Sequence, residues 1–115
     1  MTLRVGMVTI DCTDPQRLSG FWIEALGLRV GADYGEFLFL TDPEGGVQLG
    51  LQHVPEPRGG KNRLHLDLVT EDRAGEVARL VSIGATELTE HEMPGLSWTV
   101  LADPEGNQFC VGGEH

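Results

Sequence analysis

The sequence predicts an α+β protein of two βαβββ modules, which together form a curved sheet around a cleft with the helices outside. The first observation is an internal repeat: the turn Leu40–Gly45 (LTDPEG) recurs as Leu101–Gly106 (LADPEG), and self-similarity at a fixed offset marks a duplicated structural unit. A single module of about 50 residues buries too little apolar surface to be stable alone, so two are expected to pack together. The second observation is that helix-start and helix-stop residues recur at nearly the same offset, as Asp14 and Asp72, and as Gly27 and Gly84.

Module one is expected over residues 3–53. Residues 4–12 alternate between two kinds of side chain with the period of a strand. Asp14 is a good N-cap and Pro15 suits the first helical position, so a helix follows and ends at Gly27. Short strands are expected at 35–40 and 47–53, on either side of the first Asp-Pro-Glu-Gly turn.

Residues 54–62 (VPEPRGGKN) are rich in proline, glycine and charge, which is typical of a linker. Module two is expected over residues 63–112, with a strand at 63–70 and a helix between Asp72 and Gly84. Its remaining strands are expected at 86–90, 97–101 and 108–112. We therefore predict one domain, residues 1–115, made of two modules and a linker.

The composition argues against several classes of function. The formal net charge is −10 at pH 7, which disfavours binding to nucleic acid or to an anionic membrane surface. No apolar run approaches the roughly 18 residues of a membrane span, and no signal-peptide pattern follows Met1. Cys12 and Cys110 lie far apart without a CxxC motif, which favours free thiols in a reducing cytoplasm over a disulfide. The expected partner is a small molecule.

The predicted strand at 63–70 has one apolar face and one ionisable face. Its leucines are expected to lie under the helix, and its ionisable residues to line a wet cavity or an interface. In module one, the same alternation places Met7 and Thr9 on the inner face. In module two, the leucines are Leu64, Leu66 and Leu68, and the ionisable residues are Arg63, His65 and Asp67.

The paired βαβββ modules and repeated Asp-Pro-Glu-Gly turns resemble the vicinal-oxygen-chelate superfamily. That superfamily includes glyoxalase I, extradiol dioxygenases, fosfomycin-resistance enzymes and bleomycin-resistance proteins. Residues 62–68 (NRLHLDL) and 101–111 (LADPEGNQFCV) are similar to the short glyoxalase-like domain proteins of actinobacteria. The resemblance covers essentially the whole chain and implies the same fold, commonly as a homodimer.

The resemblance also implies four metal-ligand positions, one on the first and one on the last strand of each module. A one-residue bulge before the last strand of module one would decide whether Leu49 or Gln48 takes that position. Magnesium and manganese prefer oxygen ligands, and methionine is a poor zinc ligand, so no bound metal is expected. The alternative is a divalent ion such as Zn²⁺, Ni²⁺ or Mn²⁺ near His65 and Cys110. The four positions hold Met7, Leu49 or Gln48, His65 and Cys110.

Seven residues are predicted to form the ligand-binding site, with His65 as the candidate catalytic residue. His65 could donate a hydrogen bond to a ligand or act as a general base; the alternative is a histidine with a purely structural partner. Asp67 is expected to pair across the sheet, and Trp98 to form either a stacking wall for a planar ligand or part of the core. Cys110 is expected to behave as a small buried hydrophobe. The predicted set is Met7, Thr9, Leu49, His65, Asp67, Trp98 and Cys110.

The other aromatic and histidine residues have structural interpretations. Phe21 and Trp22 lie at helical spacing with other apolar residues and are expected in the core. The remaining histidines are expected in solvent; they are His53, His91 and His115.

Three functions remain open from the sequence. The first is a metal-free protein of the bleomycin-resistance type, which binds a small amphipathic or aromatic molecule in the cleft. The second is a lyase or isomerase of the glyoxalase type, which uses a metal ion or His65 as a base. The third is a degenerate module with a scaffolding role.

Overall fold

The computed structural model describes residues 5–60 and 62–113. The chain divides into two compact units, Met1–Pro57 and Arg58–His115, and their boundary falls inside the predicted linker. Residue 4 of the predicted first strand and the predicted solvent position of His115 lie outside the described residues. Within the described ranges, no helix has the length and apolar character needed to cross a membrane.

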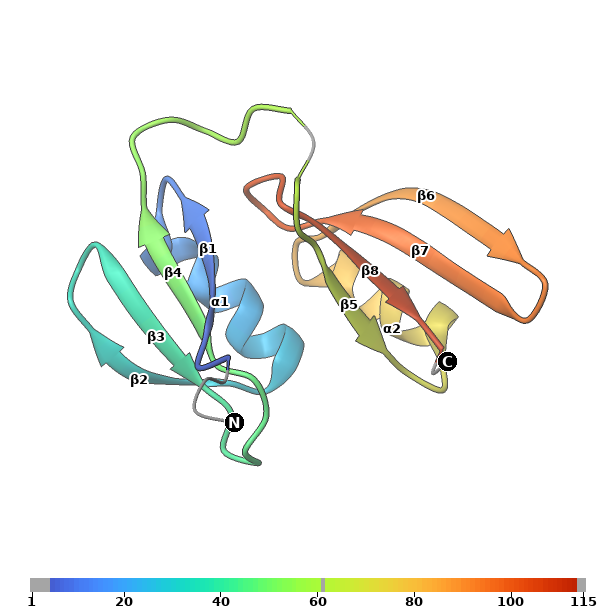
Figure 1. The fold of residues 1–115 in the computed structure, drawn as a ribbon, viewed down its shortest axis with the longest axis horizontal. Helices are drawn as coiled ribbons and strands as arrows, with labels where there is room; N and C mark the ends of the chain where they lie inside the picture. Colours follow the sequence, from blue (N-terminus) through green and yellow to red (C-terminus); the bar gives the residue numbers. More distant parts are fainter. Residues whose placement is uncertain (1–4, 61, 114–115) are drawn as a thin grey trace. The chain divides into compact units, whose positions relative to one another are not determined.

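Module one is a four-stranded mixed sheet with one helix (Figure 1). Its strand order is β1-β4-β3-β2, in which β1 runs parallel to β4 and the other neighbours are antiparallel. A parallel pair cannot be joined by a tight hairpin, so the helix and two strands form the connection between β1 and β4. The elements are β1 (Val8–Cys12), α1 (Pro15–Leu26), β2 (Arg29–Asp33), β3 (Phe37–Thr41) and β4 (Leu49–His53).

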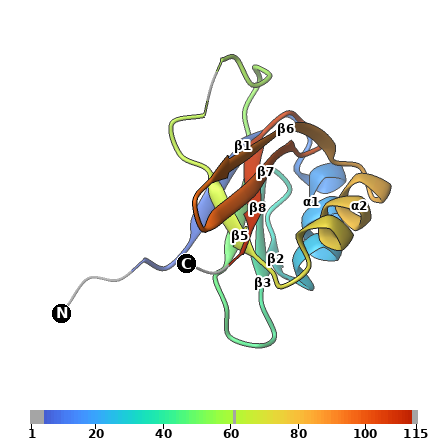
Figure 2. The same ribbon diagram turned by 90° about the vertical axis from the view of Figure 1, so that its right-hand side faces the viewer.

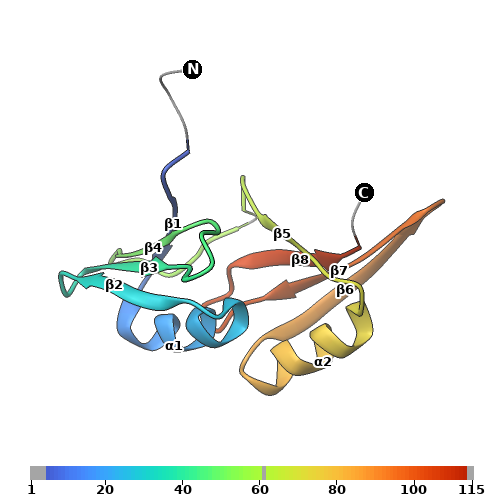
Figure 3. The same ribbon diagram turned by 90° about the horizontal axis from the view of Figure 1, so that it is seen from below.

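Helix α1 covers one face of this sheet (Figure 3). Phe21 and Trp22 on the helix are buried, and their rings pack edge to face. Full burial of one such side chain stabilises a fold by about 1.5–3 kcal/mol. The prediction that Phe21 and Trp22 belong to the core is confirmed. The strand residues that complete this core are Leu38, Leu40, Leu49 and Leu51.

Both ends of α1 follow the chemistry expected from the sequence. The Asp14 carboxylate accepts a hydrogen bond from the backbone N–H of Arg17 (3.2 Å), and Pro15 is the first helical residue. Gly27 ends the helix with a φ of 69°, a left-handed conformation that only glycine adopts at little cost.

Module two repeats this arrangement with the strand order β5-β8-β7-β6. β5 runs parallel to β8, and the other neighbours are antiparallel. Its helix lies against one face of the sheet (Figure 2), after the N-cap Asp72, whose carboxylate accepts from the N–H of Gly75 (3.0 Å). The predicted duplication of a βαβββ module is confirmed. The elements are β5 (Leu66–Val69), α2 (Arg73–Ser82), β6 (Thr86–Met93), β7 (Leu96–Ala102) and β8 (Gln108–Gly112).

The two Asp-Pro-Glu-Gly turns are built alike but hold their aspartates differently. In module one, the Asp42 carboxylate accepts from the N–H of Glu44 (2.8 Å). In module two, Asp103 is 3% exposed and accepts from the N–H groups of Glu105 and Asn107 (2.9 Å each) and from the Asn107 side-chain amide (3.0 Å). A buried carboxylate needs such donors, because an unpaired buried charge is costly.

Several strand boundaries differ from prediction, including those of β1 and β4, which begin at Val8 and Leu49 rather than at residues 4 and 47. β5 begins at Leu66 rather than at residue 63, so Leu64 precedes the strand and is 84% exposed; its predicted place under the helix is wrong. β6 extends beyond the predicted 86–90 because its pairing with β7 continues as far as Met93 opposite Leu96. The residues of β2 show no strand period, since Val30 is the only large apolar side chain among them, and β2 forms by pairing with β3.

Candidate binding site on module two

The sheet of module two has one covered face and one open face. Arg73 on α2 donates a hydrogen bond to Oγ1 of Thr99 (2.7 Å), which places Thr99 on the face that the helix covers. Because side chains alternate along a strand, Trp98 and Val100 lie on the opposite face. Cys110 is the strand partner of Val100, so it belongs to the same open face.

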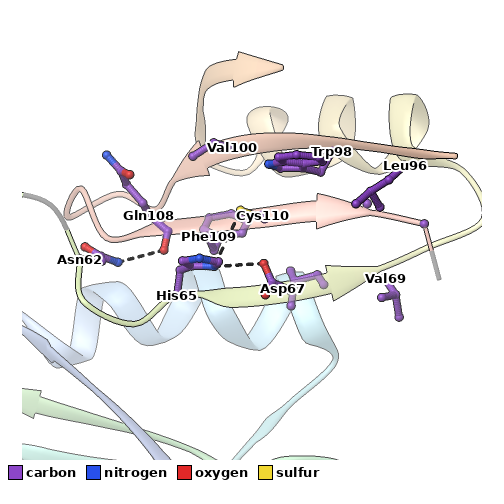
Figure 4. A pocket seen from close by; sticks show the side chains of 13 residues that line it. Asn62, His65, Asp67, Val69, Leu96, Trp98, Val100, Gln108, Phe109 and Cys110 are labelled. Atoms are coloured by element: carbon purple, nitrogen blue, oxygen red, sulfur yellow. Dashed lines mark hydrogen bonds and ion pairs between the residues drawn. The ribbon is translucent and has the colours of Figure 1, made fainter. Parts of the chain in front are cut away.

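A cavity of about 350 Å³ lies on this open face (Figure 4). Most of its lining is apolar, and its polar side chains come from β5, from β8 and from the segment before β5. Such a lining, largely apolar with a few polar groups, is typical of small-molecule sites. The apolar lining includes Val69, Leu96, Trp98, Val100 and Phe109, and the polar lining includes Asn62, His65, Asp67 and Gln108.

Three potential donor atoms meet in this cavity. Nδ1 of His65 lies 3.0 Å from Oδ1 of Asp67 and 3.9 Å from Sγ of Cys110. The side chains of His65 and Asp67 lean together. Asp67 also hydrogen-bonds with its register partner Cys110 on β8, so it has a partner across the sheet, as predicted, as well as His65. The side chains of His65 and Asp67 are 46% and 61% exposed, so a ligand in the cavity can reach both.

The thiol of Cys110 is held in its neutral form. Its pKa is raised above the ordinary 9.0, first because burial penalises the thiolate, and then because of the charge and hydrogen bonding of Asp67. Cys110 is 8% exposed, in agreement with its predicted character as a small buried hydrophobe. The prediction of free thiols is also confirmed, for both Cys12 and Cys110.

Trp98 forms a wall of the cavity and is stacked on a neighbouring ring. The imidazole of His91 lies 5.2 Å from the indole, centroid to centroid, with an interplanar angle of 17°. His91 is exposed, as predicted, and it lies within β6 directly opposite Trp98. A 3.0 Å contact between Oγ1 of Thr89 and Nε2 of His91 orients the imidazole.

The predicted site residues of module one lie in the other compact unit. Met7 and Thr9 lie on the open face of that sheet, where their side chains crowd around Gly50. Leu49 is 1% exposed and shares the helix-covered core with Leu51, so its predicted place on the ligand-binding face is wrong. The strand alternation instead turns Gln48 away from that core.

Structure thus brings four of the predicted residues together in one cavity and adds others that the sequence pattern misses. Asn62 is one of these: its amide donates to the backbone carbonyl of Gln108 (3.0 Å), and its oxygen accepts from Nε of Arg58 (2.8 Å). Nothing in the linker composition marks this residue. The four predicted residues are His65, Asp67, Trp98 and Cys110.

The fold and its repeated modules define a class of protein, and comparison with known families agrees. A family model described as "Glyoxalase-like domain" matches residues 7–112. The chain therefore belongs to the glyoxalase-like domain family, within the vicinal-oxygen-chelate superfamily. No curated protein matches the sequence.

Solved structures show the same fold at low sequence identity. A mutant of the fosfomycin resistance protein FosX from Listeria monocytogenes, complexed with Mn(II) and 1S,2S-dihydroxypropylphosphonic acid, is 13% identical with a TM-score of 0.82, covering 99% of this chain and 93% of that one. A glyoxalase/bleomycin resistance protein/dioxygenase family enzyme from Burkholderia phytofirmans PsJN is 23% identical with a TM-score of 0.75, covering 94% and 96%. At these identities the likeness concerns the fold alone.

The donor chemistry decides which metal ion the cavity could hold. One ligand atom from each of His65, Asp67 and Cys110 lies within 4.8 Å of the others. Nitrogen, carboxylate and sulfur donors suit Zn²⁺, whereas Mg²⁺ and Mn²⁺ prefer oxygen ligands. The set therefore fits zinc and not a hard cation. Zinc would polarise a substrate oxygen or acidify a bound water there.

Proposed function

We propose that this protein binds a small amphipathic or aromatic molecule on the open face of module two, without a bound metal ion. The observation that carries the proposal is the cavity itself: about 350 Å³, mostly apolar, with exposed polar groups of His65 and Asp67 at one end. An apolar body buried there gains about 25 cal/mol per Å² of apolar surface removed from water. The polar end then fixes the orientation of the ligand.

Three features favour binding without metal. The Cys110 thiol has a raised pKa, so a metal ion would first have to displace its proton. Nδ1 of the His65 imidazole contacts the Asp67 carboxylate at 3.0 Å, so a metal ion bound through Nδ1 would replace that interaction. In module one, Met7 and the buried Leu49 supply no good ligand.

The test is a titration of the ¹⁵N-labelled protein with a panel of small aromatic and aliphatic probes, followed by NMR. We expect the amide shifts to concentrate in β5, β7 and β8. His65→Ala should weaken binding about tenfold, because a ligand would lose one polar partner of the kind worth roughly 1–1.5 kcal/mol. His53→Ala, which changes an exposed histidine of module one, is the matched control.

Two results would refute this proposal. One is a panel in which no probe shifts the amides around the cavity, which is also what the scaffolding hypothesis predicts. The other is a set of shifts that ignores the cavity and is indifferent to His65→Ala.

A second candidate function is a zinc-dependent lyase or isomerase of the glyoxalase type. The proximity of His65, Asp67 and Cys110 favours it, because three protein ligands with an open position are typical of catalytic zinc. Cobalt is the spectroscopic probe of this candidate. Stoichiometric Co²⁺ should give a sulfur-to-metal charge-transfer band that Cys110→Ser abolishes; a spectrum of aqueous Co²⁺ alone would exclude the candidate.

A further inference from the structure

A row of four residues crosses the open face of module two, one from each strand. β6 contributes His91, β7 contributes Trp98, β8 contributes Gly112 and β5 contributes Val69, and each is the register partner of the next. Neighbouring strands lie about 4.8 Å apart. The side chains of such a row therefore stand beside one another on the same face.

The row has no side chain on β8 beside the indole. His91 covers one face of the Trp98 ring, stacked at 5.2 Å and 17°. On the other side stands Gly112, where even a Cβ atom would lie 3.3 Å from Cβ of Trp98. No side chain therefore covers the second face of the indole from β8, and Val69, at 56% exposure, stands beyond it.

The next row along the strands carries the charge. Asp67 is the register partner of Cys110, and Cys110 of Val100. This row lies two residues, or roughly 6.5 Å, from the row of Gly112. Among the described residues that line the cavity, none is lysine or arginine and Asp67 is the only carboxylate.

From this arrangement we infer the class of ligand: a planar aromatic ring that carries an ammonium group roughly 6.5 Å from the ring, the spacing of the two rows. The ring occupies the slot over Gly112 and stacks on Trp98, and the ammonium group reaches Asp67. This inference rests on the proposed function and deepens it. Aromatic stacking favours a planar ring over a saturated one by about two- to tenfold in affinity. An aromatic carboxylate would meet Asp67 as a like charge without a cationic lining residue to offset it.

Three probes of similar size separate these contributions: naphthylethylamine, naphthylacetate and decahydronaphthylethylamine. Dissociation constants come from ¹H–¹⁵N NMR titrations of the full chain, and the Trp98 indole signal is identified by its absence in Trp98→Phe. We expect naphthylethylamine to bind tightest and to shift the Trp98 indole signal most. Asp67→Asn should remove the preference for the amine over the acetate while the ring still binds.

A filled slot is the second arm of the test. Val69→Phe, at the register partner of Gly112 on the open face, should extend a side chain over Gly112 beside Trp98 and weaken naphthylethylamine at least fivefold. Val30→Phe, at an exposed valine of β2 in module one, should leave the dissociation constant unchanged. Asp67→Asn keeps the inference testable if Val69→Phe fails to fold.

The outcomes separate this inference from the proposal on which it rests. If probes shift the cavity amides but the three bind alike, or if the Trp98 indole signal stays still, the ring-and-ammonium class is overturned and small-molecule binding stands. If none of the three probes shifts the cavity amides, this ligand class is overturned, and the wider probe panel decides the fate of small-molecule binding.

Discussion

Cys110 shows how neighbouring residues set the chemistry of the site. The thiol is buried beside the Asp67 carboxylate, and both burial and the negative charge raise its pKa. The thiolate is the nucleophile and the metal ligand, so Cys110 is a poor nucleophile at neutral pH. Because the folded-state pKa is raised above 9.0, this group's contribution to stability is complete below pH 9.0 and is lost as the pH rises through the raised value.

Asp67→Asn should speed the alkylation of Cys110. The substitution removes the negative charge that disfavours the thiolate, so the pKa of Cys110 falls toward its ordinary value. The measurement is the rate of iodoacetamide modification at pH 8, followed by mass spectrometry of the Cys110 peptide. Cys12, buried in module one, is the internal control. A variant in which Cys110 reacts no faster than in the unchanged protein would contradict this assignment.

Individual residues also mark where sequence reasoning reaches its limit. Alternation alone is enough to place His65 and Asp67 on an ionisable face, because side chains on one strand face repeat every second residue. It cannot tell that the two side chains lean together at 3.0 Å, since that depends on rotamers. Alternation also cannot tell which residues at the start of β4 face the core. In the structure, Leu49 rather than Gln48 lies in the core.

At the scale of elements, the two Asp-Pro-Glu-Gly turns share a sequence pattern but differ in how much they contribute to stability. Asp42 is only partly buried and holds one backbone N–H, whereas Asp103 is 3% exposed and holds two backbone N–H groups and an amide. Hydrogen bonds to a charged group contribute about 1.5–3 kcal/mol, and more is lost when a buried donor is left unpaired.

Asp103→Ala should therefore destabilise the protein more than Asp42→Ala. We expect a loss of about 2–3 kcal/mol in the free energy of unfolding for Asp103→Ala and about 1 kcal/mol for Asp42→Ala. Urea denaturation followed by circular dichroism gives both values, and each variant is the control for the other. Equal losses would show that the extra donors around Asp103 add nothing.

Elements with strong local signals are predictable, and elements that depend on a neighbour are not. Helix α1 is marked by Asp14, Pro15 and Gly27, and its bounds follow from the sequence. β6 is exposed along its whole length and β2 nearly so; neither carries an alternating apolar face. Both are edge strands of their sheets, held by backbone pairing to one neighbour, which leaves little trace in composition.

At the scale of the whole molecule, two modules each carry their own sheet, helix and core. The chain divides between Pro57 and Arg58, in a stretch whose glycines are exposed. Proteases cut exposed, irregular backbone before they cut helices and strands. Repeated turns and caps are enough to predict this duplication from sequence, because each repeat forms the same structural unit with the same turn and helix-cap residues.

Mild trypsin treatment should cut first in or beside the linker, after Arg58, Lys61 or Arg63. The competing arginines in α1 and α2 have backbone groups held in helical hydrogen bonds, so their bonds are protected until the modules unfold. Intact-mass spectrometry over time identifies the first cut. A first cleavage after Arg17, Arg73 or Arg79 would show that a module opens more easily than the linker.

The central claim is that the open face of module two binds its ligand without a metal ion, although three donor atoms meet there. Its most direct test is the metal content of protein purified without chelators, measured by plasma mass spectrometry. The account predicts zinc, nickel and manganese well below one equivalent per chain, and the same content in His65→Ala. One tightly held equivalent of zinc that is lost in His65→Ala would contradict the account and establish the metal-dependent alternative.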